Sequence, residues 1–278
     1  MAAHLSHIFR HIPQIGNVVY AWWAAMHSRI DFVALVDDKP EPLAIDIASR
    51  MAEEIRAIES AANRFNPDSE LSRARAAAAE KPTVISNRLA GILDFAIKSH
   101  ARSLGFFDIT VGSLNHSANT INSVELSLDN STLFLNQSDI CLDLSGMLKG
   151  YALEAIRPIL SDAGVDNALV NFGNSSVMAI GNAPSADGWN VAFAGSNGSG
   201  ISLHDECLTT SGNNSPGRRH IVNPITGSMV EGVGQVAVVT PNAASGEVLS
   251  TALFAAGTDT AMQQAIAANF AHSRIISQ

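Results

Sequence analysis

The sequence is poor in cysteine, in aromatic residues and in charge. It has two cysteines among 278 residues, Cys141 and Cys207, and their spacing matches no zinc-binding pattern. Both lie in short apolar alternations that predict strands, so we expect buried free thiols. Hydrophobic residues make up 46% of the chain and charged residues 15%. This balance is typical of a globular protein with a sizeable core.

Long apolar runs are also missing. No stretch of roughly 20 apolar residues occurs, which argues against a membrane-spanning helix. The first 28 residues are partly apolar, but His, Arg, Pro and Asn interrupt them, so they lack the continuous core of a signal peptide. No cysteine follows them that could carry a lipid. We therefore expect a cytoplasmic protein.

Positive charge is scarce as well. The chain has 17 Lys and Arg against 26 Asp and Glu, a formal net charge of −9. Proteins that bind nucleic acid usually present a basic face, so this class of function is disfavoured. No internal repeat is present, and the length suits one large domain or two closely packed lobes.

The apolar periodicity predicts a mixture of helices and strands. Spacings of three and four predict helices at about 47–65, 87–104, 146–160, 245–256 and 259–270. Alternation predicts a first strand at 29–38, a hairpin at 124–128 and 133–135, a strand at 140–144, and further strands at 167–173, 176–181, 189–194, 202–210, 234–240 and 273–278. The segments 181–188 and 194–200 look like hairpin connections. Antiparallel strands with segregated helices make this an α+β protein.

The segment "DLSGMLKGYALEAI", 143–156, joins a predicted strand to a helix through a turn that contains glycine. A helix N-terminus offers free N–H groups and partial positive charge, which suit an anion. Lys149 in the first turn opposes that dipole unless an anion is bound. Two interpretations stay open, an anion site and an ordinary corner with a solvated lysine.

Polar residues gather where five predicted elements begin or end, at 106–114, 143–151, 171–176, 210–227 and 245–254. Such positions often build functional sites. Glu247 and Thr251 are four residues apart and share a helix face, and their oxygens are ligands that Mg²⁺ accepts. A capped helix with a polar pair explains them equally well. His220 is a candidate acid or base, or a loop histidine satisfied by its neighbours.

The order of these motifs resembles the ApbE family, the FAD:protein FMN transferases. The family pattern runs "MGT", "pdSelsrlN", "FDPTVGPL", "DLGGIAKGYA", "NLGGn", "TSG" with "HIiDP.TG", and "aDalaTAlf". This chain reads "MHS", "NPDSELSRAR", "FDITVGSL", "DLSGMLKGYA", "NFGNSS", "TSG" with "HIVNPITG", and "GEVLSTALF", in the same order. The resemblance runs from about residue 25 to the end of the chain.

The resemblance implies a fold and a set of site residues. It implies T-fold-related antiparallel sheets with packed helices, a single domain at 25–278 with an FAD cleft between two intimate lobes, and residues 1–24 as an N-terminal extension. Asp143 and Lys149 would contact FAD. Residues that would line the flavin cleft are Met26, Phe65, Phe106, Phe107, Asp108, His220 and Ile221. Mg²⁺ would take the Gly146 and Ser250 carbonyls and the Glu247 and Thr251 side chains.

The implied reaction cleaves the FAD pyrophosphate, releases AMP and attaches FMN to a Thr or Ser of an acceptor protein. Lys149 and His220 are the implied catalytic residues, with His220 as the base. The chain departs from the pattern at several places. Glu247 replaces the family's Asp, Asn174 replaces a glycine and Asn223 replaces an Asp, while Phe65 stands where many members have Tyr. Two alternatives therefore stay open, an FAD pyrophosphatase and a flavin-binding protein without catalysis.

Overall fold

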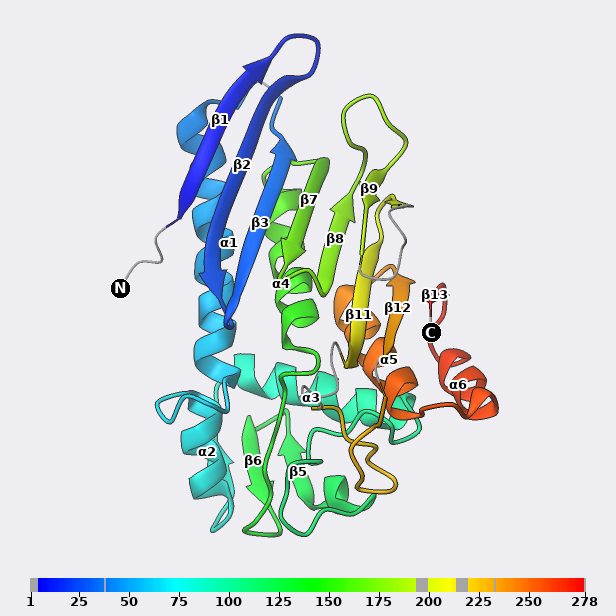
Figure 1. Ribbon diagram of the computed structural model, residues 1–278. Helices are drawn as coiled ribbons and strands as arrows, with labels where there is room; N and C mark the ends of the chain where they lie inside the picture. The colour runs from blue at the N-terminus through cyan, green and yellow to red at the C-terminus, as the bar shows by residue number, and fades with distance from the viewer. Residues whose placement is uncertain (1–4, 38, 194–199, 214–219, 233, 278) are drawn as a thin grey trace.

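The computed structural model describes residues 5–37, 39–193, 200–213, 220–232 and 234–277. Its largest element is an eight-stranded antiparallel sheet, in the order β1-β2-β3-β7-β8-β11-β12-β13. Figure 1 shows this sheet in the upper part of the molecule. Its strands are β1 Ser6–Ile12, β2 Gly16–Ala25, β3 Ser28–Leu35, β7 Asn167–Phe172, β8 Ser176–Ile180, β11 Cys207–Asn213, β12 Gly234–Thr240 and β13 Arg274–Ser277.

Each face of this sheet is covered differently. The helices α1 Glu41–Ala62, α4 Leu148–Asp162 and α5 Ala243–Ala255 pack on one face, behind the sheet in Figure 1. The short ribbon of β9 Trp189–Val191 and β10 Ile201–Leu203 covers part of the other face and closes a second apolar cluster there. Successive side chains of a strand point to opposite faces of the sheet. Apolar residues of the same strands therefore contribute to the cluster on the helix side and to the cluster under the β9–β10 ribbon.

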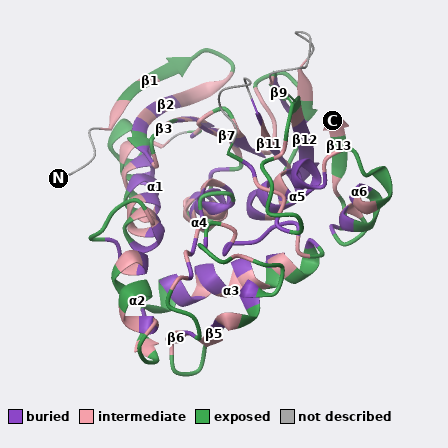
Figure 2. Ribbon diagram, turned by 60° about the horizontal axis from the view of Figure 1, so that its bottom comes forward, coloured by how far each residue is buried: buried purple, intermediate pink, exposed green. Residues whose placement is uncertain are grey.

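The lower part of the molecule contains α2 Glu70–Ala78, α3 Asn87–Arg102, the 3-10 helix η1 Thr120–Ser123 and a small sheet. That sheet has the order β4-β6-β5, from Thr83–Val84, Thr132–Leu135 and Val124–Ser127, and α6 Thr260–Ala267 lies beside β13. One continuous apolar cluster joins both parts, and Figure 2 shows the buried positions of α1, α3 and α4 facing inward. The predicted α+β fold class is confirmed.

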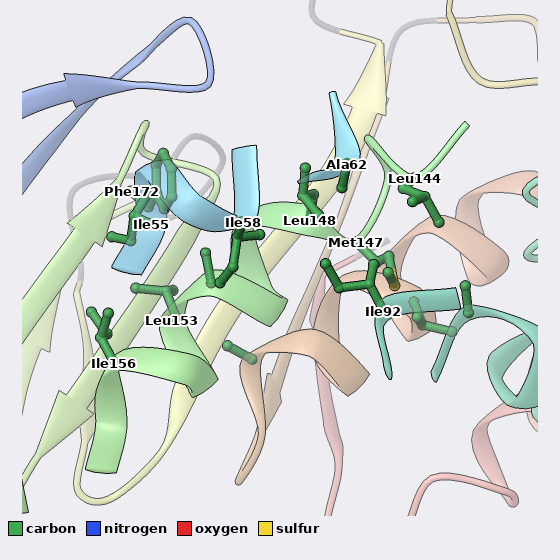
Figure 3. Packing of buried hydrophobic residues seen from close by; sticks show 14 of the residues in the cluster. Ile55, Ile58, Ala62, Ile92, Leu144, Met147, Leu148, Leu153, Ile156 and Phe172 are labelled. Atoms are coloured by element: carbon green, nitrogen blue, oxygen red, sulfur yellow. The ribbon is translucent and has the colours of Figure 1, made fainter. Parts of the chain in front are cut away.

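The helix α4 lies at the centre of this cluster. In Figure 3 its Leu153 and Ile156 point toward Ile55 of α1 and Phe172 of β7, while Met147 meets Ile92 of α3. All six side chains are fully buried. Burial of a large aliphatic side chain stabilises the fold by about 1.5–3 kcal/mol. The start of α4 is therefore held by both parts of the molecule.

Two helix predictions need correction. The first long helix ends at Ala62 and excludes Phe65, whose side chain is 64% exposed. The Asn63 side chain accepts the Phe65 N–H at 2.9 Å, so an Asx turn ends the helix before Pro67 is reached. The helix α2 was missed because its apolar positions are mostly alanine. Ser69 caps it by accepting the Ser72 N–H at 3.1 Å.

The strand predicted at 140–144 is wrong. Its apolar residues are buried, but the segment pairs with no strand in the described residues. Its backbone bonds a loop instead: the Asp143 N–H donates to the Ile109 carbonyl at 2.7 Å and the Cys141 N–H to the Ser113 hydroxyl at 2.9 Å. Both cysteines are free as expected, but Cys141 is only partly buried, whereas Cys207 is fully buried in β11.

The N-terminal residues belong to the main sheet. The strands β1 and β2 precede the strand that the sequence analysis placed first, and β2 pairs along its length with β3. The separation of residues 1–24 as an extension stays a prediction.

Residues 194–199 of the expected 194–200 connection lie outside the described residues. Over the described chain, no helix combines the length and the apolar character needed to cross a membrane.

Candidate functional site

The helix α4 begins without a capping side chain of its own. Met147 is the N-cap residue and makes no side-chain cap bond. The Gly150 N–H, in the first turn, donates to the Glu247 carboxylate of α5 at 2.8 Å. Free N–H groups and the helix dipole favour negative charge at this end. Glu247 therefore caps α4 from the neighbouring helix.

The Glu247 carboxylate is buried and satisfied at both oxygens. Besides the Gly150 N–H, it accepts a short hydrogen bond from the Ser176 hydroxyl of β8. Burial raises the pKa of Glu247 to about 7, while the bonds from Ser176 and Gly150 and the charge of Lys149 lower it. Ionisation of a buried carboxyl costs free energy, which a bound cation would offset.

Lys149, in the first turn of α4, lies close enough to Glu247 for its charge to act on that carboxylate. Its ammonium group donates to the Ser175 hydroxyl at 3.2 Å and lies 5.9 Å from the centre of the Phe172 ring. Among the described residues, no ion pair joins Lys149 to a carboxylate. A cation at a helix N-terminus is unfavourable alone, so this arrangement suits an anionic ligand.

A cluster of hydroxyl groups lies one turn further along α5. The Ser211 hydroxyl of β11 is 2.8 Å from the Ser250 hydroxyl and 3.0 Å from the Thr251 hydroxyl. Ser250 is fully buried and also donates to the Glu247 carbonyl at 3.2 Å. The packing of β11 against α5 therefore lets Ser211 orient the Thr251 hydroxyl, which lies one helical turn after Glu247.

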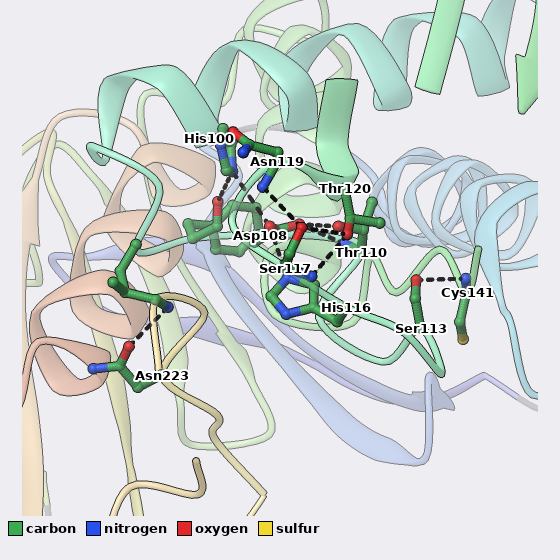
Figure 4. A network of polar contacts seen from close by, with 12 residues as sticks. His100, Asp108, Thr110, Ser113, His116, Ser117, Asn119, Thr120, Cys141 and Asn223 are labelled. Atoms are coloured by element: carbon green, nitrogen blue, oxygen red, sulfur yellow. Dashed lines mark hydrogen bonds and ion pairs between the residues drawn. The ribbon is translucent and has the colours of Figure 1, made fainter. Parts of the chain in front are cut away.

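The loop after α3 is held by a buried polar network, drawn in Figure 4. One Asp108 carboxylate oxygen accepts the Thr110 N–H and hydroxyl, both at 2.6 Å. The other lies 3.2 Å from His116 Nε2 and 3.8 Å from His100 Nδ1. The side chain of Asp108 is fully buried. The network therefore ties the loop at 106–111 to His100 of α3 and to His116.

The third carboxylate that lines the site, Asp143, is bound by neighbouring residues. It accepts the Ser145 N–H at 2.9 Å and the Ser145 hydroxyl at 2.6 Å, and pairs with Arg64 at 3.2 Å. The Arg64 side chain lies over the Phe65 ring at 4.5 Å. Asp143 thus shapes the turn that carries Gly146 and Lys149 toward the cleft.

These elements surround a cleft of about 880 Å³, a size within the usual range for small-molecule sites. It brings together most of the residues that the sequence singled out, namely Phe106, Phe107, Asp108, Asp143, Gly146, Lys149, His220, Ile221, Glu247 and Thr251. The loop at 106–111 forms one wall. Residues of β7, β8 and β11, the turn between β7 and β8, and the segment 220–224 form the others.

Three predicted residues lie off this cleft. Met26 and Phe65 line a neighbouring pocket of about 110 Å³, which shares Ser145 and Lys149 with the cleft. Ser250 is buried beneath the cleft surface. The predicted set is therefore spread over two adjoining hollows that meet at Lys149.

The sequence analysis assigned no role to several residues that line the cleft or lie directly behind its wall. Ser175, Ser176 and Ser211 were quoted within motifs, but short serine-containing stretches carry little signal without the fold. Two departures from the family pattern have a structural account. Asn174 adopts a positive φ of 60°, which Asn tolerates better than most residues, and Asn223 accepts the Ile225 and Thr226 N–H groups in an Asx turn.

The donor set of the cleft fits a hard divalent cation. Glu247, Thr251 and Gly146 line it with a carboxylate, a hydroxyl and a carbonyl, all oxygen donors of the kind Mg²⁺ takes. The buried Glu247 carboxylate has no ion-pair partner within the described part of the chain. No group of three or more His, Cys, Asp or Glu side chains suited to a metal occurs among the described residues, so the candidate set relies on hydroxyl and carbonyl oxygens besides Glu247.

Comparison with known proteins gives consistent matches. The chain is 28% identical over 228 residues to the FAD:protein FMN transferase of Chlamydia pneumoniae, covering 70% of this chain and 72% of the relative. It is 32% identical over 147 residues to the enzyme of the same name from Rhodobacter capsulatus, covering 49% of this chain and 28% of the relative.

Solved structures share the fold. The flavin transferase ApbE from Vibrio cholerae, H257G mutant, superposes with a TM-score of 0.75 at 20% identity, over 94% of this chain and 92% of the other. An ApbE protein from Thermotoga maritima gives a TM-score of 0.76 at 20% identity, over 99% and 94%. The ApbE family model matches residues 26–271. With most of its length matched by that model, this chain belongs to the ApbE family.

Proposed function

We propose that this chain is an Mg²⁺-dependent FAD:protein FMN transferase. Its curated relatives carry the name FAD:protein FMN transferase, and this chain belongs to the same enzyme class. The observation that carries the proposal is the meeting of Lys149 with the oxygen donors of Glu247, Thr251 and Gly146 in one cleft. A pyrophosphate is the ligand chemistry that needs both a lysine and a divalent cation.

In the proposed reaction, the hydroxyl oxygen of an acceptor Thr or Ser attacks the FMN phosphorus of FAD. The bond from that phosphorus to the bridging oxygen breaks, and AMP leaves with the electron pair. His220 lies on the exposed rim of the cleft and is the candidate base for the acceptor proton. Lys149 binds the pyrophosphate, and the wall formed by Phe106 and Phe107 excludes water from one side.

The candidate metal ligands are Glu247, Thr251 and the carbonyls of Gly146 and Ser250. Mg²⁺ bound there would neutralise charge that develops on the phosphate oxygens. Glu247 and Gly146 both adjoin the N-terminal turn of α4, which favours the phosphates whose charge the cation would neutralise.

Product analysis tests the proposal. The protein is incubated with FAD and Mg²⁺, alone and with extract of its native cells, and AMP, FMN and protein-bound flavin are measured. A flavin band that survives a denaturing gel and requires both Mg²⁺ and this protein supports transfer. Release of FMN and AMP without bound flavin identifies a pyrophosphatase. FAD binding without products identifies a flavin-binding protein.

We expect Lys149→Ala to weaken FAD binding about tenfold, because one charge-assisted contact to phosphate is lost. The fold should survive, since the Lys149 ammonium makes one described hydrogen bond, to Ser175. The measurement is the increase in melting temperature with FAD concentration, which reports affinity by mass action. Normal FAD binding by the variant would return this turn to an ordinary corner with a solvated lysine.

A further inference from the structure

Ser176 is a buried hydroxyl placed at the site by the sheet. It begins β8 and has no exposed surface. Its backbone pairs with Phe172 of β7 and Thr209 of β11, so two neighbouring strands set its position. Val177 belongs to the cluster under the β9 ribbon and Met178 to the helix-side core. By alternation, Ser176 points toward the helices.

The Ser176 hydroxyl donates to Oε1 of Glu247, and the Gly150 N–H donates to Oε2 at 2.8 Å. One carboxylate thereby joins a strand and two helices. The last torsion of a glutamate side chain is broad and two-fold, so a lone carboxylate turns easily. A donor at each oxygen stops that rotation. A carboxylate has about four acceptor sites, so each oxygen keeps one for a further partner.

We propose that Ser176 is a positioning residue for the metal site: its hydroxyl holds the Glu247 carboxylate in the one orientation that presents the remaining acceptor sites to a divalent cation in the cleft. This inference rests on the proposed function. Outer hydrogen bonds of this kind orient metal ligands and set their affinity. From α5, the Glu247 side chain reaches both the Ser176 hydroxyl of β8 and the Gly150 N–H of α4. The same helix places Glu247 and Thr251 in the cleft wall.

Metal binding to the whole protein tests the role of Ser176. Mn²⁺ serves as the probe, and the free ion is followed by electron paramagnetic resonance. We expect Ser176→Ala to weaken Mn²⁺ binding roughly tenfold, and Ser176→Thr, which keeps a hydroxyl, to recover most of the loss. The affinity for FAD measured without metal should stay within about twofold of the wild type, because Ser176 is absent from the cleft surface.

A matched control separates positioning from general loss of stability. Ser69 is equally buried, and its hydroxyl caps α2 away from the cleft. Ser69→Ala should lower the melting temperature, because the cap of α2 is lost, and leave Mn²⁺ affinity unchanged. If Ser69→Ala weakened Mn²⁺ binding as much as Ser176→Ala, the effect would be one of stability and the inference would fall.

A double-mutant cycle decides whether Ser176 acts through Glu247. In the Glu247→Asp background the carboxylate is one methylene shorter and is drawn away from Ser176. There, Ser176→Ala should change Mn²⁺ affinity less than about twofold. An equal loss in both backgrounds would overturn the inference and leave the proposed function standing. A wild-type protein that binds no Mn²⁺ would overturn both the inference and the metal part of the proposed function.

Discussion

We expect Glu247→Ala to lower Mg²⁺-dependent release of AMP from FAD by about a hundredfold or more. The substitution removes the one carboxylate among the candidate metal ligands that line the cleft beside Lys149. It also removes the acceptor of the Gly150 N–H, so some loss of stability accompanies it. The measurement is AMP released from FAD as a function of Mg²⁺ concentration.

Two further substitutions at Glu247 separate charge from geometry. Glu247→Gln keeps the length and an acceptor oxygen but loses the charge, so we expect a folded protein with little activity. Glu247→Asp keeps the charge and restores the residue of the family pattern, which from the sequence alone predicts tighter Mg²⁺ binding and faster AMP release. Because the glutamate reaches both Gly150 and Ser176, we expect aspartate to fall short and to weaken Mg²⁺ binding roughly tenfold.

The outcomes at Glu247 are distinguishable. Higher activity or tighter Mg²⁺ binding with Glu247→Asp would mean that the longer side chain impairs the site. Unchanged Mg²⁺ dependence in all three variants would mean that Glu247 only caps α4. A flavin-binding protein without catalysis would then be the better description of this chain.

We expect Gly150→Ala to destabilise the protein by about 3 kcal/mol. A Cβ at this position of α4 would lie 2.4 Å from the Ala243 carbonyl oxygen and 2.8 Å from the Ala244 nitrogen. These are backbone atoms at the start of α5, so no side chain can move aside. The helices must separate, and the N–H bond from residue 150 to Glu247 must lengthen. Urea denaturation gives the change in midpoint.

Gly91 provides the matched control for Gly150. It also lies inside a helix, but a Cβ there would meet only the Tyr151 hydroxyl, at an ordinary 3.5 Å. Gly91→Ala should therefore be neutral or stabilising by up to about 1 kcal/mol, through helix propensity. If Gly150→Ala had the same urea midpoint of unfolding as the wild type, the close contact between α4 and α5 would not constrain the site.

The sequence by itself determined the fold class and most of the elements. Apolar spacing located α3 and the β5–β6 hairpin within a few residues, because each buries one face and its apolar residues repeat with the period of the element. It also located α5, although that helix is buried on nearly every side. The order of seven short motifs indicated the family, which the family match at 26–271 confirms. It also selected ten residues that line one cleft.

The tertiary structure alone decided which groups partner one another. The segment 140–144 has the alternation of a strand, yet its backbone bonds the loop near Ile109 and Ser113 and pairs with no strand in the described part of the chain. The spacing of Glu247 and Thr251 showed a shared helix face, but not that Glu247 caps a different helix or meets Ser176, 71 residues away. Local periodicity reports which face is buried; contacts between distant segments depend on how whole elements pack, and no local pattern carries them.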